Sequence, residues 1–176
     1  MNRPRVAIIG AGPGGIAMGI QLAQGGYDFT IFDRGDGFGG TWRNNTYPGA
    51  ACDVPSHFYS YSYSYSFALN PRWSKTFANQ PEILAYLEEV AADNQLGERL
   101  VARTRVTTMR WSDVDRRWQL ETEDGARHQF DVVVTAVGML DVPNIPDIPG
   151  AERFRGRRFH SSRWDHTKST DRKSVV

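Results

Sequence analysis

Residues 5–33 read RVAIIGAGPGGIAMGIQLAQGGYDFTIFD, and this stretch decides the fold that we expect for the whole chain. An apolar run at Val6–Ile9 precedes a glycine-rich turn, a helix-like segment follows at Ile16–Gln24, and a second apolar run ends at Asp33. A strand, a glycine turn, a helix and a strand within about 30 residues have the size of a βαβ unit. The stretch therefore predicts two parallel strands joined by one helix.

The glycines of this turn fill the pattern G-x-G-x-x-G at Gly10, Gly12 and Gly15. Gly10 permits the tight turn, Gly12 lets the backbone approach a pyrophosphate, and Gly15 lets the helix pack closely on the strand. The helix start directs free N–H groups and the positive end of its dipole at the phosphates. Asp33 ends the second strand, where a carboxylate can accept hydrogen bonds from a ribose 2′-OH. The pattern predicts a site for NAD or FAD; the alternative is a glycine-rich turn without a ligand.

The composition indicates a soluble globular protein with no strong charge. The 176 residues include 21 basic and 20 acidic side chains, so nothing indicates a nucleic-acid or membrane partner. Apolar residues make up 40% of the chain, which fits a globular rather than a disordered protein. No apolar run reaches the length of a transmembrane helix. Cys52 is the single cysteine, so no intrachain disulfide can form and we expect a reducing, cytoplasmic location.

Two further segments have a clear period. Pro81–Ala92 carries apolar residues at helical spacing and a proline suited to the first turn, so it predicts a packing helix. Phe58–Phe67 reads FYSYSYSYSF, and its strict alternation predicts a half-buried strand or extended segment with the tyrosines packed inward. Thr41–Ser56 has almost no period, but its aromatic residues and prolines favour an ordered binding loop.

The second half of the chain predicts an antiparallel meander, because three strand-like segments are joined by turn signals. These segments are Leu100–Trp111, Arg117–Thr122 and Arg127–Ala136. A central parallel sheet is expected from Val6–Ile9, Phe29–Phe32, Val132–Thr135 and a strand from Val101 to Val106. The apolar run at 132–134 leads to Gly138, where the backbone could approach a ligand. The expected fold is therefore a three-layer α/β architecture with the meander at one side.

The end of the chain contains little regular structure. Asp141–Gly150 has three prolines and reads as an extended linker, and Ala151–Asp165 is rich in arginine. Arg172–Val176 resembles the start of another strand, so we expect the chain to be a fragment of a longer protein. The four histidines are scattered and no metal-ligand spacing appears, so no metal site is predicted.

Three stretches together resemble the class B flavoprotein monooxygenases, and within them the Baeyer–Villiger monooxygenases. The first is the glycine turn. The second runs from Gly39 to Asp53 and fills the pattern G-G-x-W-x4-[FY]-P-G-x3-D at every position. The third runs from Phe154 to Asp165 and fills F-x-G-x3-H-x3-W-[PD]. Trp164 is informative here, because N- and S-oxidising flavin monooxygenases usually have tyrosine at that position.

The resemblance implies a Rossmann-like FAD/NAD(P)-binding fold and an enzyme that uses FAD and NADPH. Residues 1–150 would form the FAD-binding domain, and residues 151–176 the linker and the start of a truncated NADP-binding domain. Reduced flavin would react with O2 to a C4a-peroxyflavin that inserts oxygen next to a ketone or oxidises a soft heteroatom. The alternatives are an N- or S-oxidising flavin monooxygenase and an inactive FAD-binding fragment; an NAD dehydrogenase would explain only residues 5–33.

The resemblance also implies roles for individual residues. Asp53 is the catalytic candidate, supporting an arginine that would lie beyond Val176, although a carboxylate there could also simply cap a loop. Trp42 could equally be a packing anchor, and His160 is expected to be a linker residue rather than an acid or base. The implied cofactor-binding residues are Gly10, Gly12, Pro13, Gly14, Gly15, Asp33, Arg34, Gly40, Thr41, Trp42, Ala51, Cys52, Asp53, Tyr59 and Val106.

Two departures from the family pattern stand out. The alternation of Tyr and Ser is longer than usual, which weakens the alignment of Tyr59. The second glycine motif, which would bind NADPH, does not occur in the sequence.

Overall fold

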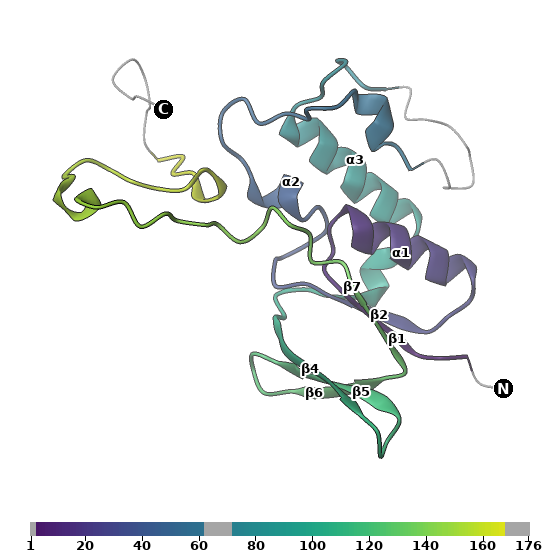
Figure 1. The fold of residues 1–176 in the computed structure, drawn as a ribbon. Coiled ribbons are helices and arrows are strands. Elements are labelled where there is room, and N and C mark those ends of the chain that lie inside the picture. The colour runs from purple at the N-terminus through teal and green to yellow at the C-terminus, as the bar shows by residue number, and fades with distance from the viewer. Residues whose placement is uncertain (1–2, 62–71, 168–176) are drawn as a thin grey trace.

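A parallel sheet of four strands in the order β3-β2-β1-β7 forms the centre of the computed structural model, which describes residues 3–61 and 72–167. Helices cover one face of this sheet and a three-stranded antiparallel sheet lies on the other (Figure 1). The predicted three-layer α/β fold is therefore confirmed. The parallel strands are β1 (Val6–Ile9), β2 (Phe29–Phe32), β3 (Leu100–Val101) and β7 (Val132–Thr135).

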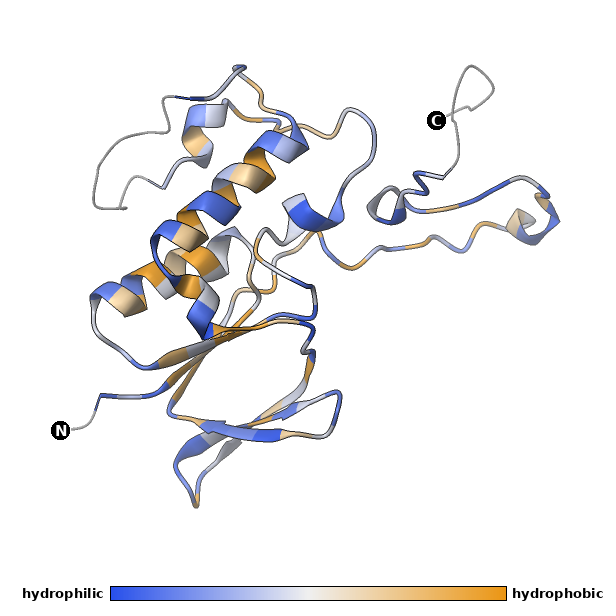
Figure 2. Ribbon diagram, turned by 180° about the vertical axis from the view of Figure 1, so that it is seen from behind, coloured by the Kyte–Doolittle hydropathy of each residue, from blue (hydrophilic) through white to orange (hydrophobic). Residues whose placement is uncertain are grey.

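Strand β1 lies between two parallel neighbours and is buried along its whole length. Successive side chains of a strand point to opposite faces, so a strand covered on both faces reads as a continuous apolar run. Ile8 packs on the helix side, whereas Ala7 and Ile9 pack with Leu120 and Phe130 of the antiparallel sheet. Figure 2 shows hydrophobic residues gathered in the parallel strands and their covering helices, while the antiparallel sheet is largely hydrophilic.

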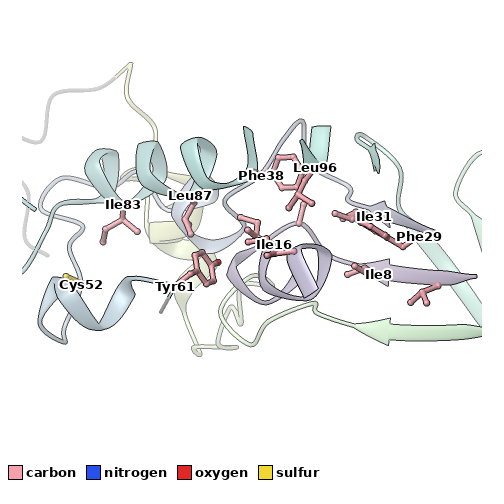
Figure 3. Close-up of a cluster of buried hydrophobic side chains, with 14 of the residues drawn as sticks. Ile8, Ile16, Phe29, Ile31, Phe38, Cys52, Tyr61, Ile83, Leu87 and Leu96 are labelled. Carbon is pink, nitrogen blue, oxygen red and sulfur yellow. The ribbon is translucent and has the colours of Figure 1, made fainter. Parts of the chain in front are cut away.

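The longest helices pack against each other and against the sheet. They are α1 (Pro13–Gln24) and α3 (Gln80–Asp93), and a short helix, α2 (Thr41–Asn44), lies beside α3. Ile83 and Leu87 of α3 are fully buried and point from the helix into the hydrophobic cluster that contains Tyr61 and Ile16 (Figure 3). The predicted helix at 81–92 is thus confirmed, and α1 starts earlier than expected because Pro13 is well suited to a first helical turn. No helix within the described ranges is long and apolar enough to cross a membrane.

The predicted meander is confirmed, but two of its strands are shorter than the segments predicted for them. Its strands are β4 (Val106–Ser112), β5 (Arg117–Thr122) and β6 (Arg127–Phe130). The segment at 100–111 divides, because Arg103 adopts a left-handed conformation with a φ of 53° and separates β3 from β4. The segment at 127–136 divides at Asp131, so that β6 joins the antiparallel sheet and β7 the parallel one. The strand expected from Val101 to Val106 therefore contributes only its first residue to the parallel sheet.

The strand predicted from the alternation of Tyr and Ser is wrong where the structure describes it. Phe58 and Tyr59 belong to a 3₁₀ helix, Ser56–Tyr59, and Phe58 is 72% exposed. The ring of Tyr59 meets the ring of Trp42 edge-on, with 5.5 Å between the ring centroids, whereas Tyr61 stacks on Tyr86 with 6.2 Å between centroids. The tyrosines thus pack individually rather than along one strand face. The rest of that segment, from residue 62, lies outside the described residues.

The loop predicted at 41–56 is shorter than expected, because its first residues form helix α2, and the hydroxyl of Ser56 anchors its end. Ser56 is 1% exposed; its Oγ accepts from the Ala78 N–H at 2.7 Å and lies 3.0 Å from the carbonyl oxygens of Lys75 and Thr76. A buried hydroxyl with these partners joins the loop to the residues that precede α3.

The substitution Ser56→Ala is expected to lower the free energy of unfolding by about 1–3 kcal/mol, because it leaves the Ala78 N–H buried without its acceptor. Urea denaturation followed by tryptophan fluorescence measures this change. Ser161→Ala, at an exposed position, is the control and is expected to stay within about 0.5 kcal/mol of the original protein. Equal unfolding midpoints for the two variants would show that the hydroxyl anchors nothing.

Candidate functional site

A cleft of about 950 Å³ opens where the parallel strands β1, β2 and β7 end. In open α/β sheets, ligands bind in the crevice outside the carboxyl ends of the strands. The cleft lining contains the ends of β1 and β2 together with the residues that follow β7. Nine of the residues proposed from sequence line it, namely Gly10, Gly12, Pro13, Gly14, Asp33, Arg34, Gly40, Thr41 and Val106.

Two glycine-rich loops meet in this cleft. Gly10 has a φ of +110° and Gly40 a φ of +53°, both in the region that favours glycine. A Cβ atom on Gly40 would lie 2.7 Å from the Cα of Gly12, so a side chain would push the loops apart. The first N–H groups of α1, which starts at Pro13, have no partner within the helix. The loops therefore form one cradle of bare backbone, which suits a pyrophosphate.

Gly15 lies beneath this cradle rather than in the cleft lining. It is buried, and a Cβ atom there would lie 1.9 Å from the carbonyl oxygen of Gly10. The structure thus shows the close packing of helix on strand turn that the sequence predicts for Gly15. Contact of this residue with a cofactor stays a prediction.

The carboxylate of Asp33 is held by backbone N–H groups on two sides. Its Oδ2 accepts from the Ala11 N–H and its Oδ1 from the Gly35 N–H, both at 2.6 Å. Its own carbonyl oxygen accepts from the Thr104 N–H at 2.8 Å. Because each carboxylate oxygen has two lone-pair sites, Asp33 can accept further hydrogen bonds while these remain. It is therefore oriented at the cleft wall and still able to receive ribose hydroxyls.

Five of the remaining proposed residues lie outside the cleft lining, in and around the loop beyond α2. Cys52 is buried, and its N–H donates to the Ala78 carbonyl oxygen at 3.0 Å, while Asp53 is exposed. The pKa of the Tyr59 hydroxyl is raised above its usual value, chiefly because the hydroxyl is partly buried and also because Asp53 and Cys52 lie nearby. The hydroxyl therefore stays neutral. The members of this second group are Trp42, Ala51, Cys52, Asp53 and Tyr59. The structure does not bring them together with the cleft residues.

Gln80 joins two parts of this second group, although nothing in its sequence context predicted this. Its backbone N–H donates to the Ala50 carbonyl oxygen at 2.8 Å, and its buried side-chain amide donates to the carbonyl oxygen of Trp42. Helix α2 and the loop that carries Asp53 are thus fixed to the first turn of α3.

Several cleft residues were not predicted from sequence because they line the cleft only after folding. Gly138 is a partial exception: it was noted as a point of close backbone approach, and it lines the cleft with a φ of +69°. The other such residues include Asn44, Thr104, Arg105, Thr107, Val137, Asp141 and Arg163. A glycine after an apolar strand is a local signal, whereas no local signal marks the others.

Comparisons with known proteins agree with this geometry. The family described as pyridine nucleotide-disulphide oxidoreductase matches residues 7–176. A Baeyer–Villiger monooxygenase of Streptomyces coelicolor is 48% identical over 163 residues, which cover 92% of this chain and 30% of that protein. This chain therefore spans about a third of the length of the curated relatives that it matches.

Solved structures of monooxygenases also have a fold similar to that of this chain. The crystal structure of cyclohexanone monooxygenase from Rhodococcus sp. Phi1 bound to NADP+ has a TM-score of 0.85 at 36% identity, covering 96% of this chain and 32% of that one. The OTEMO complex with FAD and NADP has a TM-score of 0.84 at 32% identity, covering 95% of this chain and 32% of that one.

Proposed function

The chain belongs to the pyridine nucleotide-disulphide oxidoreductase family, and on that premise we propose that it is the FAD-binding part of a Baeyer–Villiger-type monooxygenase. The observation that carries this proposal is the single backbone cradle made by the Gly12 and Gly40 loops at the ends of the parallel strands. The first loop alone would suit any dinucleotide. The second loop opens the Gly39–Asp53 motif, which an NAD dehydrogenase does not require.

The residues present fit FAD. In the proposed arrangement, the turn from Gly10 to Gly15 wraps the pyrophosphate, and Asp33 receives the adenosine ribose. The backbone N–H groups offered to the pyrophosphate are those of Gly12, Gly14 and Gly40, because the N–H groups of Gly10 and Ala11 already donate to Phe32 and Asp33. Thr41 and Val106 line the remaining walls of the cleft. Bound flavin, once reduced, supplies the reaction with O2, while the protein binds, orients and shields it.

The second group of residues is proposed to serve the reacting end of the site. Ala51–Asp53 would approach the nicotinamide side, and Trp42 and Tyr59 would support that region. Asp53 is proposed to orient an arginine, because a carboxylate fixes the fork of a guanidinium through charge-assisted hydrogen bonds. Its exposure in this chain leaves it accessible to such a partner.

The activity of the whole protein is proposed from the names of its relatives. We propose oxidation by O2 and NADPH of a ketone or a soft heteroatom, in a cytoplasmic enzyme. Residues 1–150 would form the FAD domain and residues 151–176 a linker toward an NADP-binding domain. An FAD-binding module without activity is a second candidate, which the cleft and its glycine cradle would suit equally.

The chain mixed with FAD is expected to retain flavin in a one-to-one complex after gel filtration, with a shifted visible spectrum, and NAD is expected not to displace it. Asp33→Asn is expected to weaken binding at least about tenfold, because its amide NH2 would face a backbone N–H where a carboxylate oxygen now accepts.

The matched control is Asp28→Asn, an exposed acid that precedes the same strand, β2, at its opposite end. It is expected to bind FAD as the original chain does. A chain that binds NAD in preference to FAD would contradict the proposal. With FAD bound, the absence of NADPH oxidation would indicate a binding module without activity. Where NADPH is oxidised, product analysis decides: an oxidised cyclic ketone indicates a Baeyer–Villiger enzyme, and an oxidised thioether indicates an enzyme that oxidises heteroatoms.

A further inference from the structure

The carboxylate of Asp141 receives hydrogen bonds from two elements on the far side of the cleft. The Arg34 Nη2 donates to Asp141 Oδ2 at 2.5 Å, and the Asn44 Nδ2 donates to Asp141 Oδ1 at 2.8 Å. All three residues line the cleft. Arg34 follows β2 and Asn44 ends α2, whereas Asp141 belongs to the segment that leaves β7. One carboxylate thus joins three separate parts of the cleft wall.

The order of the strands gives this cluster its position. Strands β2 and β7 flank β1 in the sheet, so the contact from Arg34 to Asp141 joins the two segments on either side of the glycine turn. The side chains of Arg34 and Asp141 are only 30% and 25% exposed. An ion pair withdrawn from water to this degree is screened less by salt than one on the open surface.

The segment that Asp141 holds carries apolar side chains toward the ligand space. Val137, Met139 and Val142 line the cleft, yet each is more than half exposed to solvent. Apolar groups that line a cleft are stabilised when a ligand covers them. A dinucleotide bound in the cleft would therefore lie between the glycine cradle and this segment.

We propose that Asp141 is a positioning residue that closes the cleft on a bound dinucleotide and slows its release. It holds the 137–143 segment against the opposite wall and orients the Arg34 guanidinium, whose remaining N–H groups are available to ligand oxygens. The inference rests on the proposed function, since it concerns retention of the same ligand.

A second contact limits how far the segment can open. The side chains of Thr46, shortly after α2, and His166 lie 2.7 Å apart, between Oγ1 and Nε2. The region beyond Asp141 thus stays attached to the body of the protein when the Asp141 contacts are removed. Loss of Asp141 is expected to loosen the rim of the cleft rather than detach the segment.

The test is the rate at which FAD leaves the full chain, followed by the recovery of flavin fluorescence after rapid dilution of the complex. Asp141→Ala is expected to accelerate release about tenfold, since two charge-assisted hydrogen bonds are lost, with Asp141→Asn between it and the original chain. Raising the ionic strength is expected to accelerate release from the original chain by a larger factor than release from Asp141→Ala, because only the original chain has this ion pair for salt to screen.

Asp147→Ala, at an exposed acid six residues further along the chain than Asp141, is the matched control and is expected to release FAD at the original rate. Asn44→Ala is expected to accelerate release on its own but not in the Asp141→Ala background, because both act through one carboxylate. The inference would be overturned if Asp141→Ala released FAD at the same rate as Asp147→Ala, or more slowly than it. If the alanine variant fails to fold, the nearly isosteric Asp141→Asn decides by the same rates. Failure of the original chain to bind FAD contradicts the proposed function instead.

Discussion

Replacing Gly15 with alanine is expected to lower the free energy of unfolding by about 3 kcal/mol, although alanine normally stabilises a helix relative to glycine. The added Cβ would lie 1.9 Å from the carbonyl oxygen of Gly10, which is backbone and cannot rotate away. Helix α1 would have to move off the turn that follows β1. Since Ile16 and Ile20 of this helix are completely buried, that shift would open the core.

Gly14→Ala is the matched control for this prediction. Gly14 precedes Gly15 in the same helix, but a Cβ there meets only the Cβ of Ala136, at 3.8 Å, which is ordinary van der Waals contact. Its free energy of unfolding is expected to be unchanged or slightly higher. Thermal and urea denaturation of both variants measure the difference. If Gly15→Ala were as stable as Gly14→Ala, helix and turn would not be packed as closely as the structure shows.

The substitution Gly40→Ala is expected to weaken FAD binding at least about a hundredfold, equivalent to roughly 2.7 kcal/mol. Its Cβ would lie 2.7 Å from the Cα of Gly12, so the two loops of the cradle would separate. Backbone donors serve a pyrophosphate only at hydrogen-bonding distance, and a displacement of a few tenths of an ångström affects all of them together. Titration with FAD, followed by the quenching of flavin fluorescence, gives the dissociation constants.

The control for this substitution is Gly49→Ala, in the same sequence motif. Gly49 also has a positive φ, +79°, so alanine is strained there too, but no atom lies within 4 Å of the added Cβ. Gly49→Ala is expected to bind FAD with an affinity close to that of the original chain. Comparable losses of affinity in both variants would mean that backbone strain, and not separation of the loops, causes the effect.

Much of the architecture follows from local features of the sequence. The apolar run Val6–Ile9 predicts a parallel strand, and β1 is such a strand, buried on all four residues. The apolar stripe at 81–92 predicts a packing helix, and α3 buries Ile83 and Leu87 as that spacing requires. These predictions hold because the period of a helix or strand is set within the segment itself.

Other features depend on contacts between distant residues. The alternation at 58–61 suits a strand, but Trp42 and Tyr86 supply separate packing sites for Tyr59 and Tyr61, and the backbone forms a 3₁₀ turn instead. The carboxylate of Asp33 was predicted at the end of a strand, yet its hydrogen bond to the Ala11 N–H appears only when β1 and β2 lie side by side.

The sequence by itself determined the strand–glycine turn–helix–strand unit, the packing helix and the two longer motifs that distinguish this chain from a plain NAD-binding protein. Each of these is a pattern of spacing within one stretch of chain. Only the tertiary structure decided that Asp141 meets Arg34, 107 residues away, and that Gly40 approaches Gly12 too closely for a side chain. It also decided which sheet the residues on either side of Arg103 and Asp131 join. The physical reason is that periodicity states which side of a segment is buried, whereas the partner that buries it is selected by the packing of the whole chain.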